Sequence, residues 1–281
     1  MKIDLAYLNE VNKEKNRLQD QIDQLVKENE QLKTMLANKS VPTKTVPTRV
    51  NIFNHNKKVI NVAVIGQTNS GKSTLVGNLL YKSGFIDNNE FKQIEKEAID
   101  HGKSSLKYAF VSDKMEEERE RGFTIKCSSS FIETSEHYYR IIDTPGSLNY
   151  IDNLINELSN ADITILVVDP TPYQRTQFSL IAFTFGAKFV LVAINEMDDT
   201  AINYSKPYFN AIKDQFTKQL TGIGFKEDHL FFVPVSGFNG ENLTNKSSKL
   251  SWWNNGTLLE TLDSIEIPDK ADDDKPLRFI V

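Results

Sequence analysis

The loop at residues 66–74 joins residue types that bind phosphate. It reads GQTNSGKST, has the spacing GxxxxGK[ST] and directly follows the apolar run Val59–Ile65. A strand that enters a glycine-bearing turn and then a helix gathers unpaired backbone N–H groups around a hollow that fits a diphosphate. Lys72 is placed to reach the terminal phosphates, and the hydroxyl of Ser73 is placed to bind Mg²⁺. The loop residues predicted to bind a nucleotide are Asn69, Ser70, Gly71, Lys72, Ser73 and Thr74.

A second segment suited to a phosphate and its metal reads Asp143-Thr144-Pro145-Gly146 and is followed by Ser147. An aspartate that ends an apolar strand can hold Mg²⁺ through water, while the N–H of Gly146 approaches a γ-phosphate. The pattern DxxG is weak alone. It gains weight from its position, one strand after the charged segment described next.

That charged segment, 107–133, contains Thr124 within RGFTI. A threonine in a mobile loop ahead of a strand can bring its hydroxyl to the metal and its backbone to the γ-phosphate, so that the loop is ordered only while this phosphate is present. The sequence therefore predicts a switch with Thr124 as a metal ligand, beside Ser73 and Asp143. Taken without the neighbouring motifs, residues 115–121 would indicate a solvated, salt-bridged helix.

Two further segments are suited to selecting the base. Asn195-Glu196-Met197-Asp198 follows an apolar run, and the carboxylate of Asp198 can accept two hydrogen bonds from the N1–H and N2–H₂ edge of guanine. Adenine does not offer these donors, a difference of about 1–3 kcal/mol. The backbone of Ser236-Gly237-Phe238 can then donate to the guanine carbonyl. Together with Asn195, these residues predict GTP or GDP rather than ATP as the ligand.

The elements that must position these segments follow an alternating pattern. Apolar strand-like runs alternate with helical patterns, which favours an α/β fold with a mostly parallel sheet and helices on both faces. The predicted strands are Val59–Ile65, 138–142, Ile163–Val168, Phe189–Ile194 and 230–235. Phosphate-binding loops lie at the carboxyl ends of such strands, so we expect the four segments to meet at one edge of the sheet.

The first 38 residues have a different pattern. Positions spaced by three and four residues form one helical seam, with leucines at the d positions and Asn29 at an a position, where a buried amide pairs with its twin in a parallel dimer. Residues 1–38 therefore predict a coiled-coil homodimer. A lone amphipathic helix on its own globular domain or on a partner remains the alternative. Residues 39–58 are proline-containing and basic, and they predict an extended linker before a domain at 59–270.

The bulk composition limits the class of partner. The 281 residues carry a net charge of −5 with a pI near 5.5, so no global basic field supports direct DNA or RNA binding. The single cysteine, Cys127, cannot form an internal disulfide, and no run is long and apolar enough for a signal peptide or a membrane span. We expect a cytoplasmic protein.

The chain resembles the translational GTPases of the elongation factor 1-alpha class, which includes the ribosome-rescue factor Hbs and the class-II release factor. The resemblance rests on the segments GQTNSGKST, KYAFVSDKMEEERERGFTI, DTPGS, LIAFTFGAKFVLVAINEMDD, FVPVSGFNGENL, GTLLETLDSIEIP and KPLR. It implies a Ras-like G domain of the P-loop NTPase class, with residues 271–281 as the start of a following β-barrel. It also implies GTP or GDP and Mg²⁺ as ligands, and the ribosome or translation factors as partners.

Three departures from this family all touch the nucleotide. The family has a histidine that orients the attacking water directly after DxPG, where this chain has Ser147, and none of the four histidines matches it. The family's NKxD lysine is replaced by Glu196, and its phosphate-loop aspartate by Asn69, with Thr68 in place of an apolar residue. The loop at 171–176 is also shortened.

Two functions from different classes fit these features. The leading one is a Mg²⁺·GTP switch that hydrolyses GTP slowly, with Lys72, Thr124, Gly146 and Ser147 at the catalytic positions. The other is a non-catalytic nucleotide-binding scaffold that dimerises through its coiled coil. A complete decoding factor would require β-barrels that this sequence does not contain.

Overall fold

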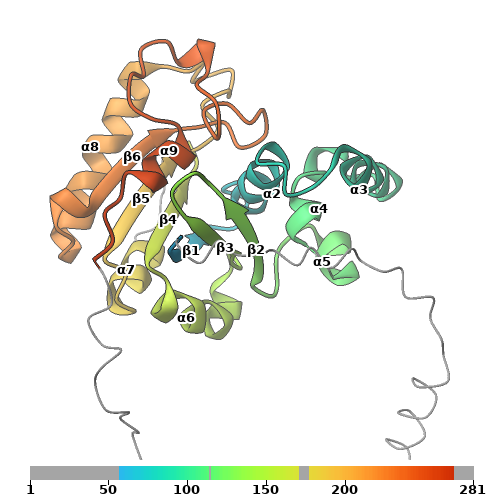
Figure 1. Ribbon diagram of the computed structural model, residues 1–281, viewed down its shortest axis with the longest axis horizontal. Helices are drawn as coiled ribbons and strands as arrows, with labels where there is room; N and C mark the ends of the chain where they lie inside the picture. The colour runs from blue at the N-terminus through green and yellow to red at the C-terminus, as the bar shows by residue number, and fades with distance from the viewer. Residues whose placement is uncertain (1–56, 114, 171–176, 269–281) are drawn as a thin grey trace, which may run out of the picture. The chain divides into compact units, whose positions relative to one another are not determined.

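The computed structural model of this chain describes residues 57–113, 115–170 and 177–268 (Figure 1). The predicted coiled coil at 1–38, nearly all of the linker at 39–58, the shortened loop at 171–176 and the predicted barrel strand at 271–281 lie outside the described residues.

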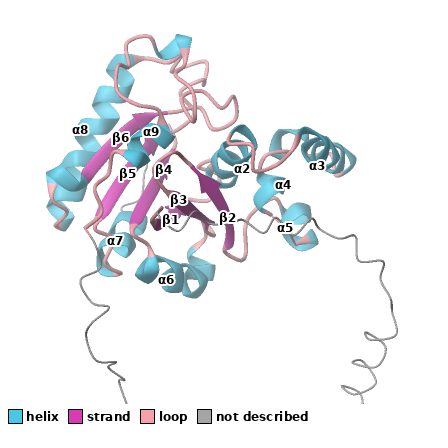
Figure 2. Ribbon diagram, viewed as in Figure 1, coloured by secondary structure: helices cyan, strands magenta, loops and turns pink. Residues whose placement is uncertain are grey.

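A six-stranded sheet carries the fold, in the order β2-β3-β1-β4-β5-β6 (Figure 2). All neighbouring strands are parallel except β2 and β3, which are antiparallel. The five predicted strands are present. The second of them extends one residue further, to Asp143, and the last ends one residue earlier, at Pro234. Strand β2 is additional to these five. The strands are β1 (Val59–Ile65), β2 (Ser128–Glu133), β3 (Tyr138–Asp143), β4 (Ile163–Val168), β5 (Phe189–Ile194) and β6 (Leu230–Pro234).

Helices cover both faces of this sheet, as predicted (Figure 2). One apolar core packs α2, α3 and α9 on one face, and a second packs α6, α7 and α8 on the other. The helices are α2 (Lys72–Lys82), α3 (Asn88–Asp100), α4 (Ala109–Ser112), α5 (Glu116–Arg121), α6 (Ile151–Asn160), α7 (Gln177–Thr184), α8 (Lys206–Ile223) and α9 (Leu258–Asp263). Short 3₁₀ turns are η1 (Ser104–Leu106), η2 (Leu148–Tyr150), η3 (Glu227–His229) and η4 (Ser248–Leu250).

Side-chain caps explain where several helices begin. The carboxylate of Asp87 accepts hydrogen bonds from Asn89 N and Glu90 N, both at 2.8 Å, and starts α3. Thr257 and Glu260 form a reciprocal capping box at the start of α9. Each satisfies backbone N–H groups that the first turn of a helix leaves unpaired. Within the described ranges, no helix is long and apolar enough to cross a membrane.

The segment between α3 and β2 packs tightly on α2. Gly77, in the middle of α2, faces the turn before α4, and a Cβ atom there would overlap the carbonyl oxygen of Tyr108. Only a glycine lets the two backbones approach this closely. The position of α4 therefore depends on the absence of a side chain at residue 77.

We expect Gly77→Ala to destabilise the protein by about 1–3 kcal/mol, because the methyl group must displace the backbone at Tyr108. Urea denaturation of the full chain measures the change. The control is Gly222→Ala in α8, where the added Cβ would meet open space and should stabilise the helix by about 0.5–1 kcal/mol. Equal stability of Gly77→Ala and the wild type would contradict the packing of α4 on α2.

Candidate nucleotide site

The predicted segments meet at the carboxyl edge of the sheet, where β1, β3, β5 and β6 end. The side-chain amide of Asn195 joins two of them: its Nδ2 donates to Ser70 O at 2.9 Å, and its Oδ1 accepts from Gly237 N at 2.8 Å. Asn195 is buried. It therefore ties the phosphate loop to the loop that follows β6.

The phosphate loop has the backbone that its glycines allow. Gly71 has φ 83° and Asn69 has φ 67°, both in the left-handed region that glycine and asparagine tolerate best. The buried ammonium of Lys72 donates to Gln67 O at 2.6 Å. Burial lowers the pKa of Lys72 to about 8, and the nearby charges of Asp143, Asp169 and Asp113 only partly oppose this shift.

The predicted metal-binding hydroxyls lie side by side. Ser73 Oγ is 2.8 Å from Thr124 Oγ1, which in turn donates to Asp113 Oδ1 at 2.9 Å. Thr124 is buried rather than on an open loop, because Asp113 and α5 hold it in place. Burial, followed by the charge of Asp143, raises the pKa of Asp113 to about 7. Sequence reasoning missed Asp113, whose position in the charged segment gives no motif signal.

Helix α5 fits the alternative interpretation of residues 115–121 only in part. Arg121 and Glu117 form an exposed ion pair at 2.9 Å, as expected of a solvated helix. Glu118 is buried instead, and its Oε1 accepts hydrogen bonds from Ile125 N at 2.9 Å and Lys126 N at 3.0 Å. The helix therefore anchors the backbone that follows Thr124.

Asp143 is fully buried at the end of β3, and neither of its carboxylate oxygens has a hydrogen-bond partner among the described residues. Burial raises its pKa to about 6, and the neighbouring Ser73 hydroxyl and Lys72 ammonium offset this shift only in part. A buried carboxylate without a partner, close to two hydroxyls, fits a hydrated Mg²⁺ ion. No group of three or more His, Cys, Asp or Glu side chains in the described part of the chain is arranged to hold a metal, so such an ion would also need phosphate oxygens and water.

The segment after Asp143 lies against the phosphate loop. A Cβ atom at Gly146 would lie 2.6 Å from Thr68 N, so a side chain does not fit there. Ser147 is half-buried, and its Oγ accepts a hydrogen bond from Asn149 N at 3.3 Å as the cap of η2. The structure thus gives Ser147 a local capping contact.

Three of the predicted base-selecting residues, Asn195, Asp198 and Phe238, line a cavity of about 430 Å³, whereas Ser236 and Gly237 do not line it. Asp198 is half-buried, and its Oδ2 accepts a hydrogen bond from Asn239 Nδ2 at 2.9 Å, which orients the carboxylate. Glu196 adopts φ 56°, and its pKa is raised by burial and then by the charges of the surrounding aspartates. The residues that line this cavity are Asn69, Gly71, Thr74, Leu106, Asn195, Glu196, Asp198, Asp199 and Phe238.

Asn78 also supports the loop after β6 and was not predicted. It is fully buried in α2, and its Nδ2 donates to Gly237 O at 2.8 Å and to Phe238 O at 2.9 Å. In the same loop, Ser236 is buried and its Oγ accepts from Asn239 N at 3.1 Å. A polar residue on the buried side of the helix after the phosphate loop is the only sequence signal for the role of Asn78.

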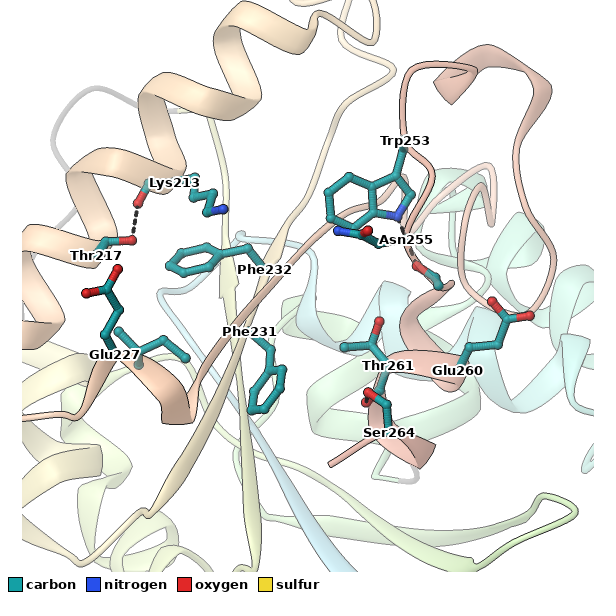
Figure 3. Close-up of a pocket in the computed structure, with 12 residues that line it drawn as sticks. Lys213, Thr217, Glu227, Phe231, Phe232, Trp253, Asn255, Glu260, Thr261 and Ser264 are labelled. Carbon is teal, nitrogen blue, oxygen red and sulfur yellow. Dashed lines mark hydrogen bonds between the residues drawn. The ribbon is translucent and has the colours of Figure 1, made fainter. Parts of the chain in front are cut away.

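Another cavity of about 430 Å³ lies along β6, between α8 and the segment that contains α9 (Figure 3). Aromatic side chains line it, among them Phe231, Phe232 and Trp253. None of its lining residues belongs to the four predicted nucleotide-binding segments.

Loops that gather N–H groups at the carboxyl edge of a parallel sheet are typical of P-loop nucleotide-binding domains. Within that class, the chain belongs to the family described as the elongation factor Tu GTP binding domain, whose model matches residues 57–268. This confirms the resemblance inferred from the motifs.

Two curated relatives are similar over the same region. Elongation factor 1-alpha of Tetrahymena pyriformis is 41% identical over 231 residues, which cover 78% of this chain and 53% of the relative. Elongation factor 1-alpha of Hyperthermus butylicus is 41% identical over 233 residues, which cover 79% of this chain and 53% of that relative. The chain therefore spans about half the length of these relatives.

Solved structures share the fold. The S. cerevisiae Ski7 GTPase-like domain bound to GTP aligns with a TM-score of 0.65 at 23% identity, covering 74% of this chain and 49% of that chain. Sup35 complexed with GDP aligns with a TM-score of 0.55 at 24% identity, and the alignment covers 79% of this chain and 48% of the Sup35 chain.

We expect Asp143→Asn to stabilise the nucleotide-free protein at pH 7.5 by about 2 kcal/mol, because it removes a buried charge that has no hydrogen-bond partner. A carboxyl whose pKa is raised on folding contributes stability below its ordinary pKa and loses it as pH rises through about 6. The advantage of the variant should therefore vanish towards pH 4. Thermal unfolding from pH 4 to 7.5 measures it.

The control for this series is Asp214→Asn, which changes an exposed carboxylate on α8. It should leave stability within about 0.5 kcal/mol of the wild type. A destabilised Asp143→Asn protein at pH 7.5 would show that the carboxylate makes a contact that stabilises the fold.

Proposed function

We propose that this chain is a guanine-nucleotide switch that binds GTP or GDP with Mg²⁺ and hydrolyses GTP slowly. The observation that carries the proposal is the buried, unpartnered carboxylate of Asp143 beside the hydroxyl pair of Ser73 and Thr124. Burying such a charge costs stability, and a cation bound through water compensates for it.

The residues of the phosphate loop would bind the phosphates. The N–H groups of residues 69–74 would surround the β-phosphate, and the ammonium of Lys72 would exchange its bond to Gln67 O for one to the terminal phosphates. Ser73, Thr124 and Asp143 would hold Mg²⁺, the last through water. An ion held by these residues would supply positive charge beside the phosphoryl group. Gly146, which lies against the phosphate loop, would donate its N–H to a γ-phosphate.

The base would lie in the cavity that Asn195 and Asp198 line. Asn239 holds the Asp198 carboxylate in one orientation, which lowers the cost of ordering it when guanine binds. Of the loop residues predicted to donate to the guanine carbonyl, Gly237 N already donates to Asn195 Oδ1 and Ser236 N to Glu241 O. Phe238, which lines the cavity, would supply the backbone donor.

Slow hydrolysis follows from Ser147. The serine side chain is shorter than the family's histidine and cannot carry an imidazolium charge, so it would not orient the attacking water in the same way. Positioning and Mg²⁺ alone would then stabilise the transition state. The capping bond from Asn149 N also favours a second candidate, a scaffold that binds nucleotide without turnover and dimerises through residues 1–38. In either case we propose a cytoplasmic protein with translation factors or the ribosome as partners, because the relatives are elongation factors.

We expect GTP and GDP to bind in the presence of Mg²⁺ and ATP not to bind at the same concentrations, because adenine lacks the donors that Asp198 accepts. Isothermal titration calorimetry with the three nucleotides decides it. Asp198→Ala should reduce the preference for guanine by about 1–3 kcal/mol.

The matched control is Asp199→Ala, since Asp199 lines the same cavity and is exposed. Its preference for guanine should stay at the wild-type level. Equal affinity of the wild type for ATP and GTP, or no nucleotide binding at all, would refute the proposed function.

We expect Ser147→His to speed hydrolysis by about ten- to a hundredfold, because an imidazole at this position can orient the attacking water. The gain stays below the usual contribution of such a group, since Thr68 and Asn69 alter the adjacent loop. Single-turnover hydrolysis of prebound GTP is the measurement.

Leu148→His is the control, because it places the same side chain one residue further along, at an exposed position. It should leave the rate unchanged. Rapid hydrolysis by the wild type would show that another group orients the water, and no hydrolysis in either form despite tight GTP binding would favour the scaffold.

A further inference from the structure

A chain of aromatic rings links the predicted switch segment to the base cavity. Tyr81 stacks on Phe91 with ring centroids 4.1 Å apart, and Phe91 stacks on Tyr108 at 5.1 Å. Tyr108 then meets Phe238 edge to face, at 6.1 Å and an interplanar angle of 84°. The first two rings belong to α2 and α3, Tyr108 belongs to the segment before α4, and Phe238 lines the base cavity.

Tyr108 is held firmly at its end of this chain. Its carbonyl oxygen lies directly over Gly77 of α2, and its ring lies 5.4 Å from the ammonium of Lys107. Lys107 is itself paired with Glu95 of α3 at 2.7 Å. Tyr108, near the start of the switch segment, thus packs on α2 and α3 as well as on Phe238.

Phe238 is held only weakly at the other end. Its side chain is 44% exposed, although the backbone carbonyl of the same residue accepts a hydrogen bond from Asn78. An exposed ring at the mouth of a cavity has apolar surface that a planar ligand can cover.

Leu106 completes the apolar wall. It lies two residues before Tyr108, and it lines both the base cavity and the smaller cavity of about 70 Å³ around Lys72 and Thr124. Leu106 thus lies between the region of Asp198, where the base would bind, and the region of Lys72, where the phosphates would bind. Leu106 ends η1, directly before the switch segment 107–133, so the residue next to that segment contributes to the surface of the base cavity.

This wall has a physical use in this chain. Glu196 stands where the resembled family has a lysine over the guanine, and Glu196 shares the cavity rim with Asp198 and Asp199. The rim of the cavity therefore has carboxylates where the family has the aliphatic part of a lysine side chain, which covers the guanine. Leu106 and Phe238 supply apolar surface that Glu196 does not.

We propose that Leu106, Tyr108 and Phe238 form a clamp through which a bound purine nucleoside positions the switch segment. Leu106 and Phe238 contact the nucleoside, and Tyr108 is a positioning residue that acts through Phe238. The proposal rests on the proposed guanine-nucleotide binding and adds a coupling between the base and the switch. Because Phe238 lines the base cavity and not the cavity around Lys72 and Thr124, inorganic pyrophosphate should bind without contacting Phe238.

Calorimetry with Mg²⁺·GDP and with Mg²⁺ and pyrophosphate tests the clamp. We expect Phe238→Leu and Tyr108→Leu each to weaken GDP binding about three- to tenfold, as the loss of one aromatic contact implies. Since both changes break the same contact, the double variant should bind GDP within about twofold of the weaker single variant. Pyrophosphate affinity should not change in any of them.

Tryptic cleavage after Lys103 and Lys107 reports the position of the switch segment. Saturating GDP should slow this cleavage in the wild type, and pyrophosphate should not. In Phe238→Leu the protection by GDP should be lost even at saturation. Tyr108→Phe keeps the ring and should behave as the wild type in both measurements.

Phe183→Leu is the matched control. Phe183 belongs to α7, is 41% exposed and makes an edge-to-face contact with Phe225 at a centroid distance of 5.1 Å. It should change neither GDP affinity nor cleavage. Additive losses in the double variant, equal losses for pyrophosphate and GDP, or retained protection in Phe238→Leu would each overturn the clamp. A wild type that fails to bind GDP refutes the proposed function, whereas unchanged GDP binding in the variants refutes only the clamp.

Discussion

The geometry of the site depends on one buried amide. Asn195 bonds Ser70 O through its Nδ2 and Gly237 N through its Oδ1, so a single side chain sets the spacing between the phosphate loop and the base loop. A Cβ atom at Gly71 would overlap the same Nδ2, which makes glycine necessary there for a second reason besides its φ of 83°. The two loops can therefore come this close only when the Asn195 amide is buried between them and residue 71 has no side chain.

The site also contains buried ionisable groups whose charged forms destabilise the folded protein. Burial favours the neutral forms of Lys72 and Asp143, which lowers the pKa of the first to about 8 and raises that of the second to about 6. Asp113 behaves like Asp143 and holds Thr124 beside Ser73. Groups of this kind are expensive in a protein core and are typical of sites that bind ions or phosphates. Such a site gains stability when its ligand binds.

Much of the fold could be predicted because its signals are local. The apolar runs and the glycine loop predicted the parallel strands and the phosphate loop within a residue or two. Asn78 and Tyr108 could not be predicted, because the residues they contact lie far away in the chain: Asn78 supports a carbonyl 160 residues further on. Asp113 could not be predicted because no motif marks it, although its partner Thr124 is only 11 residues away. The edge strand β2 was implied only as the strand after Thr124, since its half-exposed residues lack a continuous apolar run.

The departures from the family fall at accessible positions. Thr68 and Asn69 are exposed, and Ser147 and Glu196 are half-buried, whereas Lys72, Asp143 and Asn195 are buried. Retention of Asn195 alone says little about activity, because its amide also holds two loops together. Asp143 differs, since its buried carboxylate has no hydrogen-bond partner at bonding geometry among the described residues, and Ser73 and Lys72 offset the cost of its burial only in part. A chain that had ceased to bind a metal-linked nucleotide would have no physical reason to keep that charge, so Asp143 is the residue that most favours a working switch over an inert scaffold.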